Sequence, residues 1–130
     1  MPIFGRVSAV KDTSDKIYSY AKFSIHPGKL EEFKRLAREC SRIVNEQEPG
    51  TLFYEWFMNA DETECVALDC YRDIAAMLEH IKHIAPLMRS LMGISERYLE
   101  IFGKDPFPVL GGSATSKSTE FYGPRILGKI

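Results

Sequence analysis

The stretch TLFYEWFM, residues Thr51–Met58, decides the fold of this 130-residue chain. Its high content of aromatic side chains predicts a β-strand. Because successive strand residues point to opposite faces, we expect one face to carry Leu52, Tyr54, Trp56 and Met58. The other face is expected to carry Phe53, Glu55 and Phe57. Both faces of this strand are therefore predicted to be apolar, which a layer of helices on one side does not explain.

A second strand is expected to return beside the first. The polar segment NADET, residues 59–63, has the length of a hairpin connection. The segment ECVALDCY, residues Glu64–Tyr71, then reads as the returning strand. Its alternation predicts one face with Val66, Leu68 and Cys70, and an opposite face with Cys65, Ala67, Asp69 and Tyr71.

A strand and an amphipathic helix are predicted before this hairpin. YSYAKFSI, residues Tyr18–Ile25, reads as the first strand, and His26-Pro27-Gly28 ends it. From Leu30 to Val44, apolar residues recur three and four positions apart with charged residues between them, which predicts a helix. This helix is expected to end near Glu48-Pro49-Gly50. Its polar face is expected to be solvated and includes Lys34, Arg35 and Arg38.

A second helix is predicted after the hairpin. Asp73 is expected to cap it, and apolar residues from Ile74 to Ala85 form its buried stripe. Pro86 is expected to break or bend this helix. A short continuation, Leu87–Met92, is then expected before Gly93.

The final strand and two terminal extensions complete the predicted organisation. RYLEIF, residues Arg97–Phe102, alternates and reads as the last strand, ended by Gly103. We therefore predict an N-terminal arm at 1–17, one domain at 18–103 and an extended C-terminal tail at 104–130. The apolar segment Phe121–Leu127 of the tail is expected to dock on the domain or on a partner subunit.

The predicted order of strand, helix, strand, strand, helix, strand is that of the split β-α-β, or ferredoxin-like, α+β sandwich. Such a sandwich has four antiparallel strands with both helices on one face. The open face would then expose the apolar side chains around Trp56. A twofold partner is the simplest cover for an apolar face, so we expect a homodimer. The alternative is that the arm or the tail covers this face in a monomer.

Composition narrows the classes of function. The net charge is −1, so no basic field indicates nucleic-acid binding, and no apolar run reaches the length of a membrane span. The start of the sequence lacks the pattern of a secretory signal, which favours a cytoplasmic location. The three cysteines, Cys40, Cys65 and Cys70, read as buried thiols. No nucleotide, flavin, haem or metal motif is present, so no cofactor and no metal are expected.

Three stretches carry a resemblance to a known family. They are FSIHPGKLEEF (23–33), EPGTLFYE (48–55), and LDCYRD (68–73) running into LEHI (78–81). Together they resemble the antibiotic biosynthesis monooxygenases, also called quinol monooxygenase-like proteins, within the dimeric α+β barrel group. The resemblance covers about residues 18–103. It implies cofactor-independent oxygenation of phenols or hydroquinones to quinones.

The chain also departs from the family pattern. Asp69-Cys70-Tyr71 stands where members often carry Glu-x-Trp at the end of the third strand. The haem-degrading branch uses an asparagine and a tryptophan where this chain has Ala21 and Tyr71, which argues against haem degradation. His80 is the best match to a family histidine on the second helix, and His83 matches a second one loosely.

Oxygenation without a cofactor requires a water-poor cavity, a base near neutral pKa and access for oxygen. His80 and His83 lie three residues apart on the predicted helix, so they are candidates for the base. Asp69 and Tyr71 share a strand face and can supply a carboxylate and a hydrogen-bond donor to orient a histidine. The predicted substrate contacts are Trp56 and Tyr54, which can stack on a flat aromatic molecule, and Glu55, a second acid–base candidate.

Each of these residues also has a purely structural interpretation. The histidines can be solvated residues beside the apolar stripe, and the aromatic residues can be packing groups. Asp69 can pair with Arg72 or Lys22, and Glu55 can form a structural ion pair. Two other functions therefore stay open: an isomerase or processing enzyme for a small metabolite, and a non-catalytic dimeric binding module.

Overall fold

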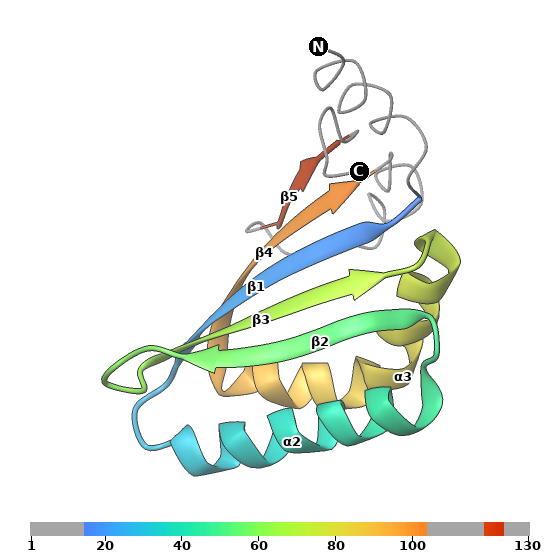
Figure 1. The fold of residues 1–130 in the computed structure, drawn as a ribbon. Helices are drawn as coiled ribbons and strands as arrows, with labels where there is room; N and C mark the ends of the chain where they lie inside the picture. The colour runs from blue at the N-terminus through green and yellow to red at the C-terminus, as the bar shows by residue number, and fades with distance from the viewer. Residues whose placement is uncertain (1–14, 104–118, 124–130) are drawn as a thin grey trace.

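A computed structural model describes residues 15–103 and 119–123 of the chain (Figure 1). Its strands form one sheet in the order β2-β3-β1-β4-β5. The first four strands pair antiparallel, and β5 pairs parallel with β4. In chain order the elements are β1 (Ile17–Ile25), α2 (Leu30–Gln47), β2 (Thr51–Met58), β3 (Glu64–Tyr71), α3 (Ile74–Gly93), β4 (Ser95–Gly103) and β5 (Thr119–Tyr122).

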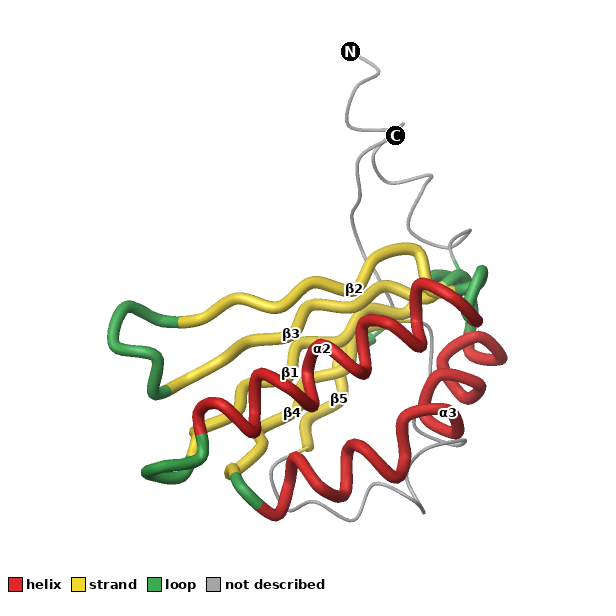
Figure 2. The backbone as a smooth tube through the Cα atoms, turned by 90° about the horizontal axis from the view of Figure 1, so that it is seen from below, coloured by secondary structure: helices red, strands yellow, loops and turns green. Residues whose placement is uncertain are grey.

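Both helices lie against the same face of the sheet, as Figures 1 and 2 show. The predicted ferredoxin-like α+β fold is therefore confirmed. The predicted strand count is wrong for the described residues, because Thr119–Tyr122 of the predicted tail adds a fifth strand beside β4. The parts of the predicted arm and tail at 1–14, 104–118 and 124–130 lie outside the described residues.

The bounds of β2 and β3 match the prediction, since the alternation that specifies them is local. Helix α2 buries Phe33, Leu36, Cys40 and Val44, all of which belong to the predicted stripe. Helix α3 begins after Asp73, whose side chain accepts a hydrogen bond of 2.9 Å from the Ala76 backbone N–H. This contact is the predicted N-cap.

Pro86 does not break α3, which is continuous from Ile74 to Gly93. Of the two predicted alternatives, a break is therefore wrong and a bend remains. A proline inside a helix removes one backbone donor, and helices often accommodate that loss by a change of direction. Figure 2 shows such a change of direction between the two halves of α3.

Leu52 also departs from the prediction. The pairing of β2 with β3 shifts between Thr51 and Phe53, which leaves Leu52 in an irregularity of the ladder. Its side chain is 47% exposed. Tyr54, Trp56 and Met58 keep the predicted orientation and pack against the core under the helices.

The core lies between the helices and the sheet and contains two clusters. The larger one surrounds Phe23 and Phe33, whose rings meet edge to face at 5.3 Å. Trp56 stacks on Phe23 at 5.8 Å. The smaller cluster contains Ile17, Tyr71, Ala76, Met77 and Ile101, and Phe121 of β5 packs against it. Cys40, Cys65 and Cys70 are free and buried.

Candidate functional site

A cavity of about 70 Å³ lies between α3 and the sheet. Its polar lining includes Asp69 and Tyr71 from β3, and His80 from α3. The first two face the helices because they share the parity of buried Cys65 and Ala67 along β3. The rest of the lining is largely apolar and includes Phe23, Met77, Ile81, Ile84, Met88, Leu99 and Ile101. Acid–base side chains are thus held in a mostly dry environment.

A buried carboxylate, Glu48, joins the two histidines of α3. His80 Nδ1 donates to Glu48 Oε1 at 2.8 Å, and His83 Nδ1 donates to Glu48 Oε2 at 2.9 Å. The Thr51 hydroxyl also donates to Glu48 Oε1, at 2.7 Å. Glu48 itself is 7% exposed. Its three donors therefore replace the water that a carboxylate otherwise requires.

The connection from α2 to β2 carries Glu48 onto α3. A Cβ atom on buried Gly50 would lie 2.7 Å from the Ala76 Cβ, so only glycine allows the two segments this close. The Gly50 carbonyl also accepts a hydrogen bond of 2.8 Å from the Arg72 backbone N–H. Residues 48–50 therefore form a tight connection whose shape presents the glutamate to the histidines.

Glu48 is ionised at neutral pH. Burial opposes its ionisation, but the hydrogen bonds from His80, Thr51 and His83 outweigh burial and lower the Glu48 pKa to about 2. A carboxylate only accepts hydrogen bonds, so the Nδ1 atom of each histidine carries a hydrogen. In a neutral imidazole the other nitrogen, Nε2, is then a proton acceptor.

The two histidines differ in their surroundings. His80 is buried, lines the cavity, and contacts the rings of Tyr54 and Tyr71 at centroid distances of 5.1 and 5.2 Å. The His83 side chain is 24% exposed, and its Nε2 lies 3.8 Å from Glu79 Oε1. The interpretation of both histidines as solvated residues is therefore wrong for His80. Of the two, His80 is the one placed to meet a molecule in the cavity.

Asp69 forms a buried pair with Tyr71. The Tyr71 hydroxyl donates to Asp69 Oδ2 at 2.7 Å. Burial raises the pKa of Asp69 to about 6, although the Tyr71 hydrogen bond and the nearby His80 oppose the rise. Neither Arg72 nor Lys22 pairs with Asp69, so that structural alternative is wrong; Arg72 Nε lies 3.5 Å from Asp73 Oδ2 instead. Glu48, rather than Asp69, is the carboxylate that orients the histidines.

Comparison with known proteins gives the family. The family model described as antibiotic biosynthesis monooxygenase matches residues 17–85, just over half of the chain. The chain belongs to the antibiotic biosynthesis monooxygenase family. The predicted family resemblance is thus confirmed. No curated protein sequence matches the chain.

Solved structures of similar fold agree with this assignment. MupZ from Pseudomonas fluorescens is 20% identical, with a TM-score of 0.76 over 90% of this chain and 96% of MupZ. A variant of SnoaB from Streptomyces nogalater, described as a cofactor-independent oxygenase, is 18% identical, with a TM-score of 0.62 over 70% of this chain and 94% of SnoaB. A Nitrosomonas europaea protein assigned to the family is 20% identical, with a TM-score of 0.63 over 71% and 92%. At these identities the likeness concerns the fold alone.

In this family member, the predicted site residues do not all meet. Tyr54 and Trp56 line the cavity together with Asp69, Tyr71 and His80. Glu55 is exposed and lies on the opposite face of β2, so the structure does not bring it together with the other predicted site residues. Trp56 also contacts Phe23 and Phe33, so the packing interpretation holds for this residue too.

Buried polar atoms without a partner mark the cavity. Among the described residues, four buried side-chain atoms lack a hydrogen bond, and three belong to residues that line this cavity: Trp56 Nε1, Asp69 Oδ1 and Arg97 Nε. Leaving such an atom unpaired costs about 1–3 kcal/mol. Burial also lowers the Arg97 pKa. Asp69 Oδ1 and Arg97 Nε thus offer one hydrogen-bond acceptor and one donor to a molecule bound in this cavity.

Sequence reasoning missed both Glu48 and Arg97. A glutamate at the end of a helix is usually interpreted as a solvated residue. The available signal for Glu48 was indirect: two neighbouring histidines favour a carboxylate partner. Arg97 shares the strand parity of Leu99 and Ile101, which line the cavity with it. That parity was the available signal.

Among the described residues no cluster of three or more His, Cys, Asp or Glu side chains is arranged to hold a metal ion. No described helix is long and apolar enough to cross a membrane.

Proposed function

We propose that this protein is a cofactor-independent monooxygenase that oxidises a small phenolic or quinol-like substrate with molecular oxygen. The observation that carries the proposal is the buried pair of His80 and ionised Glu48 at the cavity. The pair orients the imidazole with Nδ1 toward Glu48, so a neutral His80 would present Nε2 as a proton acceptor, which is the arrangement of an oriented general base. Membership of the family and the SnoaB fold likeness favour oxygenation as the reaction.

The proposed reaction begins with transfer of the phenol proton to His80 Nε2. The phenolate then donates electrons to oxygen, and a carbon–oxygen bond forms at a ring carbon that bears hydrogen. Loss of that hydrogen as a proton with cleavage of the oxygen–oxygen bond leaves a carbonyl and hydroxide. The hydroxide takes the proton held by His80 and leaves as water. The net change is phenol plus oxygen to quinone plus water.

Other cavity residues have supporting roles in this proposal. Asp69 Oδ1 is unpaired and can accept a hydrogen bond from a second substrate hydroxyl. Tyr71 holds the other oxygen of that carboxylate. Tyr54 and Trp56 supply aromatic surface for a flat substrate. Arg97 can receive a carbonyl or phenolate oxygen at the β4 side of the cavity.

The size of the cavity restricts the substrate. Ligand pockets usually measure about 300–1,000 Å³, whereas this one measures about 70 Å³. We therefore expect a single-ring substrate, admitted by movement of the methionines that line the cavity. Methionine side chains suit this because they are unbranched and adapt easily. The lining methionines are Met77 and Met88.

The test is oxygen uptake by protein treated with a metal chelator, across a panel of single-ring phenols and hydroquinones. His80→Ala is expected to lower the rate by about 10²–10⁴-fold, the usual contribution of a general base. His26→Ala is the matched control, because that histidine lies outside the cavity, with a side chain 42% exposed. No uptake with any substrate, or equal rates in the wild type and His80→Ala, would refute the proposal.

A proton-transfer reaction without oxygen is the second candidate. It is favoured by a second acid–base group in the same cavity, since Asp69 has a pKa of about 6. An isomerase of this type would exchange substrate hydrogen with solvent deuterium under nitrogen. Exchange without oxygen consumption would favour the isomerase, whereas ligand binding without either reaction would favour a binding module.

We further propose that the protein acts as a homodimer paired through the sheet face opposite the helices. Phe53 and Phe57 of β2 point to that face and are 39% and 51% exposed. The described part of the tail, β5, lies beside β4 at the sheet edge. Sedimentation velocity tests the dimer: Phe57→Glu is expected to dissociate it, whereas Leu78→Glu on α3 is not. A wild-type monomer at micromolar concentration would contradict the proposal.

A further inference from the structure

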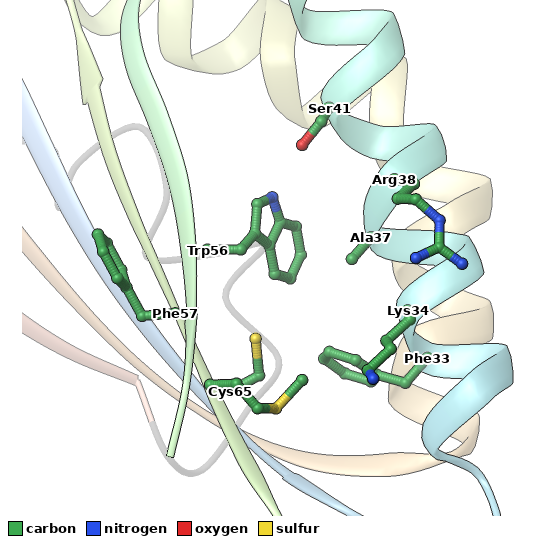
Figure 3. Close-up of a pocket in the computed structure, with 9 residues that line it drawn as sticks. Phe33, Lys34, Ala37, Arg38, Ser41, Trp56, Phe57 and Cys65 are labelled. Carbon is green, nitrogen blue, oxygen red and sulfur yellow. The ribbon is translucent and has the colours of Figure 1, made fainter. Parts of the chain in front are cut away.

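A second and larger hollow lies between α2 and β2, outside the cavity described above (Figure 3). We call it the α2–β2 groove. Its volume is about 320 Å³, within the usual range for ligand pockets of about 300–1,000 Å³. Trp56 is common to the two hollows, and none of the catalytic candidates lines the groove. The groove is lined mainly by Phe33, Lys34, Ala37, Arg38, Trp56 and Met58.

The groove combines an apolar floor with a basic rim. Figure 3 shows the Trp56 ring pointing from β2 toward α2, with Lys34 and Arg38 on the helix side. The positive charge of Lys34 is compensated by two ion pairs, because its Nζ lies 3.0 Å from Glu62 and 3.7 Å from Glu31. Among the described residues no acidic side chain lies within ion-pair distance of Arg38, in contrast to Arg42 on the same helix. The uncompensated charge at the rim is therefore positive.

A further polar atom points to a ligand with an oxygen acceptor. The Trp56 Nε1 atom is buried without a hydrogen-bond partner among the described residues. In Figure 3 this nitrogen is on the Ser41 side of the ring, within the space between β2 and α2. An acceptor placed there would satisfy the indole N–H. The positive rim and the indole N–H both favour a ligand that presents an oxygen acceptor. The apolar floor favours a ligand with an apolar body.

We propose that the α2–β2 groove binds an apolar carboxylic acid. The carboxylate pairs with the Arg38 guanidinium, the side chain best suited to carboxylates because its N–H groups form a planar fork. The apolar body of the ligand lies on Trp56, Phe33 and Met58. This site does not depend on the proposed oxygenase activity, because His80, Asp69 and Tyr71 take no part in it. The sequence alone indicated only a solvated helix face at Lys34 and Arg38.

Trp56 makes the proposal directly testable, because it is the only tryptophan in the chain. We would titrate the full-length protein with 4-phenylbutyrate and follow tryptophan fluorescence, with 4-phenylbutanol and 4-phenylbutylamine as matched neutral and cationic probes. The expected result is a saturable change with the acid and at least tenfold weaker binding of both other probes. Equal binding of the alcohol and the acid would overturn the proposal.

Variants locate the site. Arg38→Ala is expected to weaken binding of the acid at least tenfold, and Ala37→Leu is expected to abolish it by filling the groove. Arg35→Ala is the control for charge, because Arg35 is exposed on α2 and does not line the groove. Asp69→Asn should leave binding unchanged, whereas tighter or weaker binding by that variant would place the acid in the inner cavity and overturn the assignment. Dissociation of a dimer by Ala37→Leu would also overturn it, since the groove would then be a contact between copies.

Discussion

Replacement of Glu48 by glutamine should destabilise the protein strongly at neutral pH and only weakly in acid. Glu48→Gln keeps the shape of the side chain but removes the negative charge of the carboxylate, which accepts hydrogen bonds from His80, His83 and Thr51. The fall of the Glu48 pKa from 4.5 to about 2 corresponds to about 3 kcal/mol of folding free energy at pH 7. With an m-value of about 1–3 kcal/mol/M, the urea midpoint should fall by roughly 1–3 M.

The pH dependence identifies the cause. Because the pKa of Glu48 is lower in the folded state, its stabilisation is complete above the unfolded value of 4.5 and is lost as the pH falls toward 2. The difference in the free energy of unfolding between wild type and Glu48→Gln should therefore shrink as the pH falls through that interval. Urea unfolding at pH 7, 4 and 2.5 measures it. Glu46→Gln is the control, since that exposed residue pairs with Arg42 at the surface. A stable Glu48→Gln protein at pH 7, or a loss independent of pH, would refute the reasoning.

Three further predictions concern the same region. Gly50→Ala should destabilise the protein by about 1–3 kcal/mol in urea unfolding, because its Cβ would lie 2.7 Å from Ala76; an unchanged midpoint would contradict the tight connection. Asp69→Asn should raise stability at pH 7 by up to about 3 kcal/mol, because the folded pKa of about 6 lies above the usual 3.8, so stability is lost as the pH rises through that interval; a lower urea midpoint at pH 7 would contradict the raised pKa. Asp73→Ala should cost about 1 kcal/mol through loss of the N-cap bond to Ala76; no change in thermal midpoint would argue against that cap.

The sequence specified the main elements because their signals are local. The alternation of β2 and β3 and the stripe of α2 predicted their positions. The irregularity at Leu52 and the fifth strand at Thr119–Tyr122 could not be predicted, since both depend on which strand lies alongside. The path of α3 through Pro86 depends on helix packing in the same way.

The site was predicted in part for a similar reason. His80, Asp69 and Tyr71 could be placed on faces of their own elements, and those faces do line one cavity. Glu48 is 32 residues from His80 in the sequence, so their contact is a product of the tertiary fold. Glu55 was predicted to contact the substrate because its neighbours in the sequence are aromatic, although the alternation of β2 already placed it on the opposite face. Strand parity was therefore a better guide than proximity in the sequence.

The tautomer of His80 tests the central claim most directly, because the proposed chemistry requires a free acceptor at Nε2. Nitrogen-15 NMR of histidine-labelled protein at pH 7.5 distinguishes the two ring nitrogens. We predict that His80 carries its hydrogen on Nδ1, protected from solvent exchange, and that Glu48→Gln removes that protection. A hydrogen on Nε2, or a spectrum of His80 indifferent to Glu48→Gln, would contradict the proposal that His80 is the base.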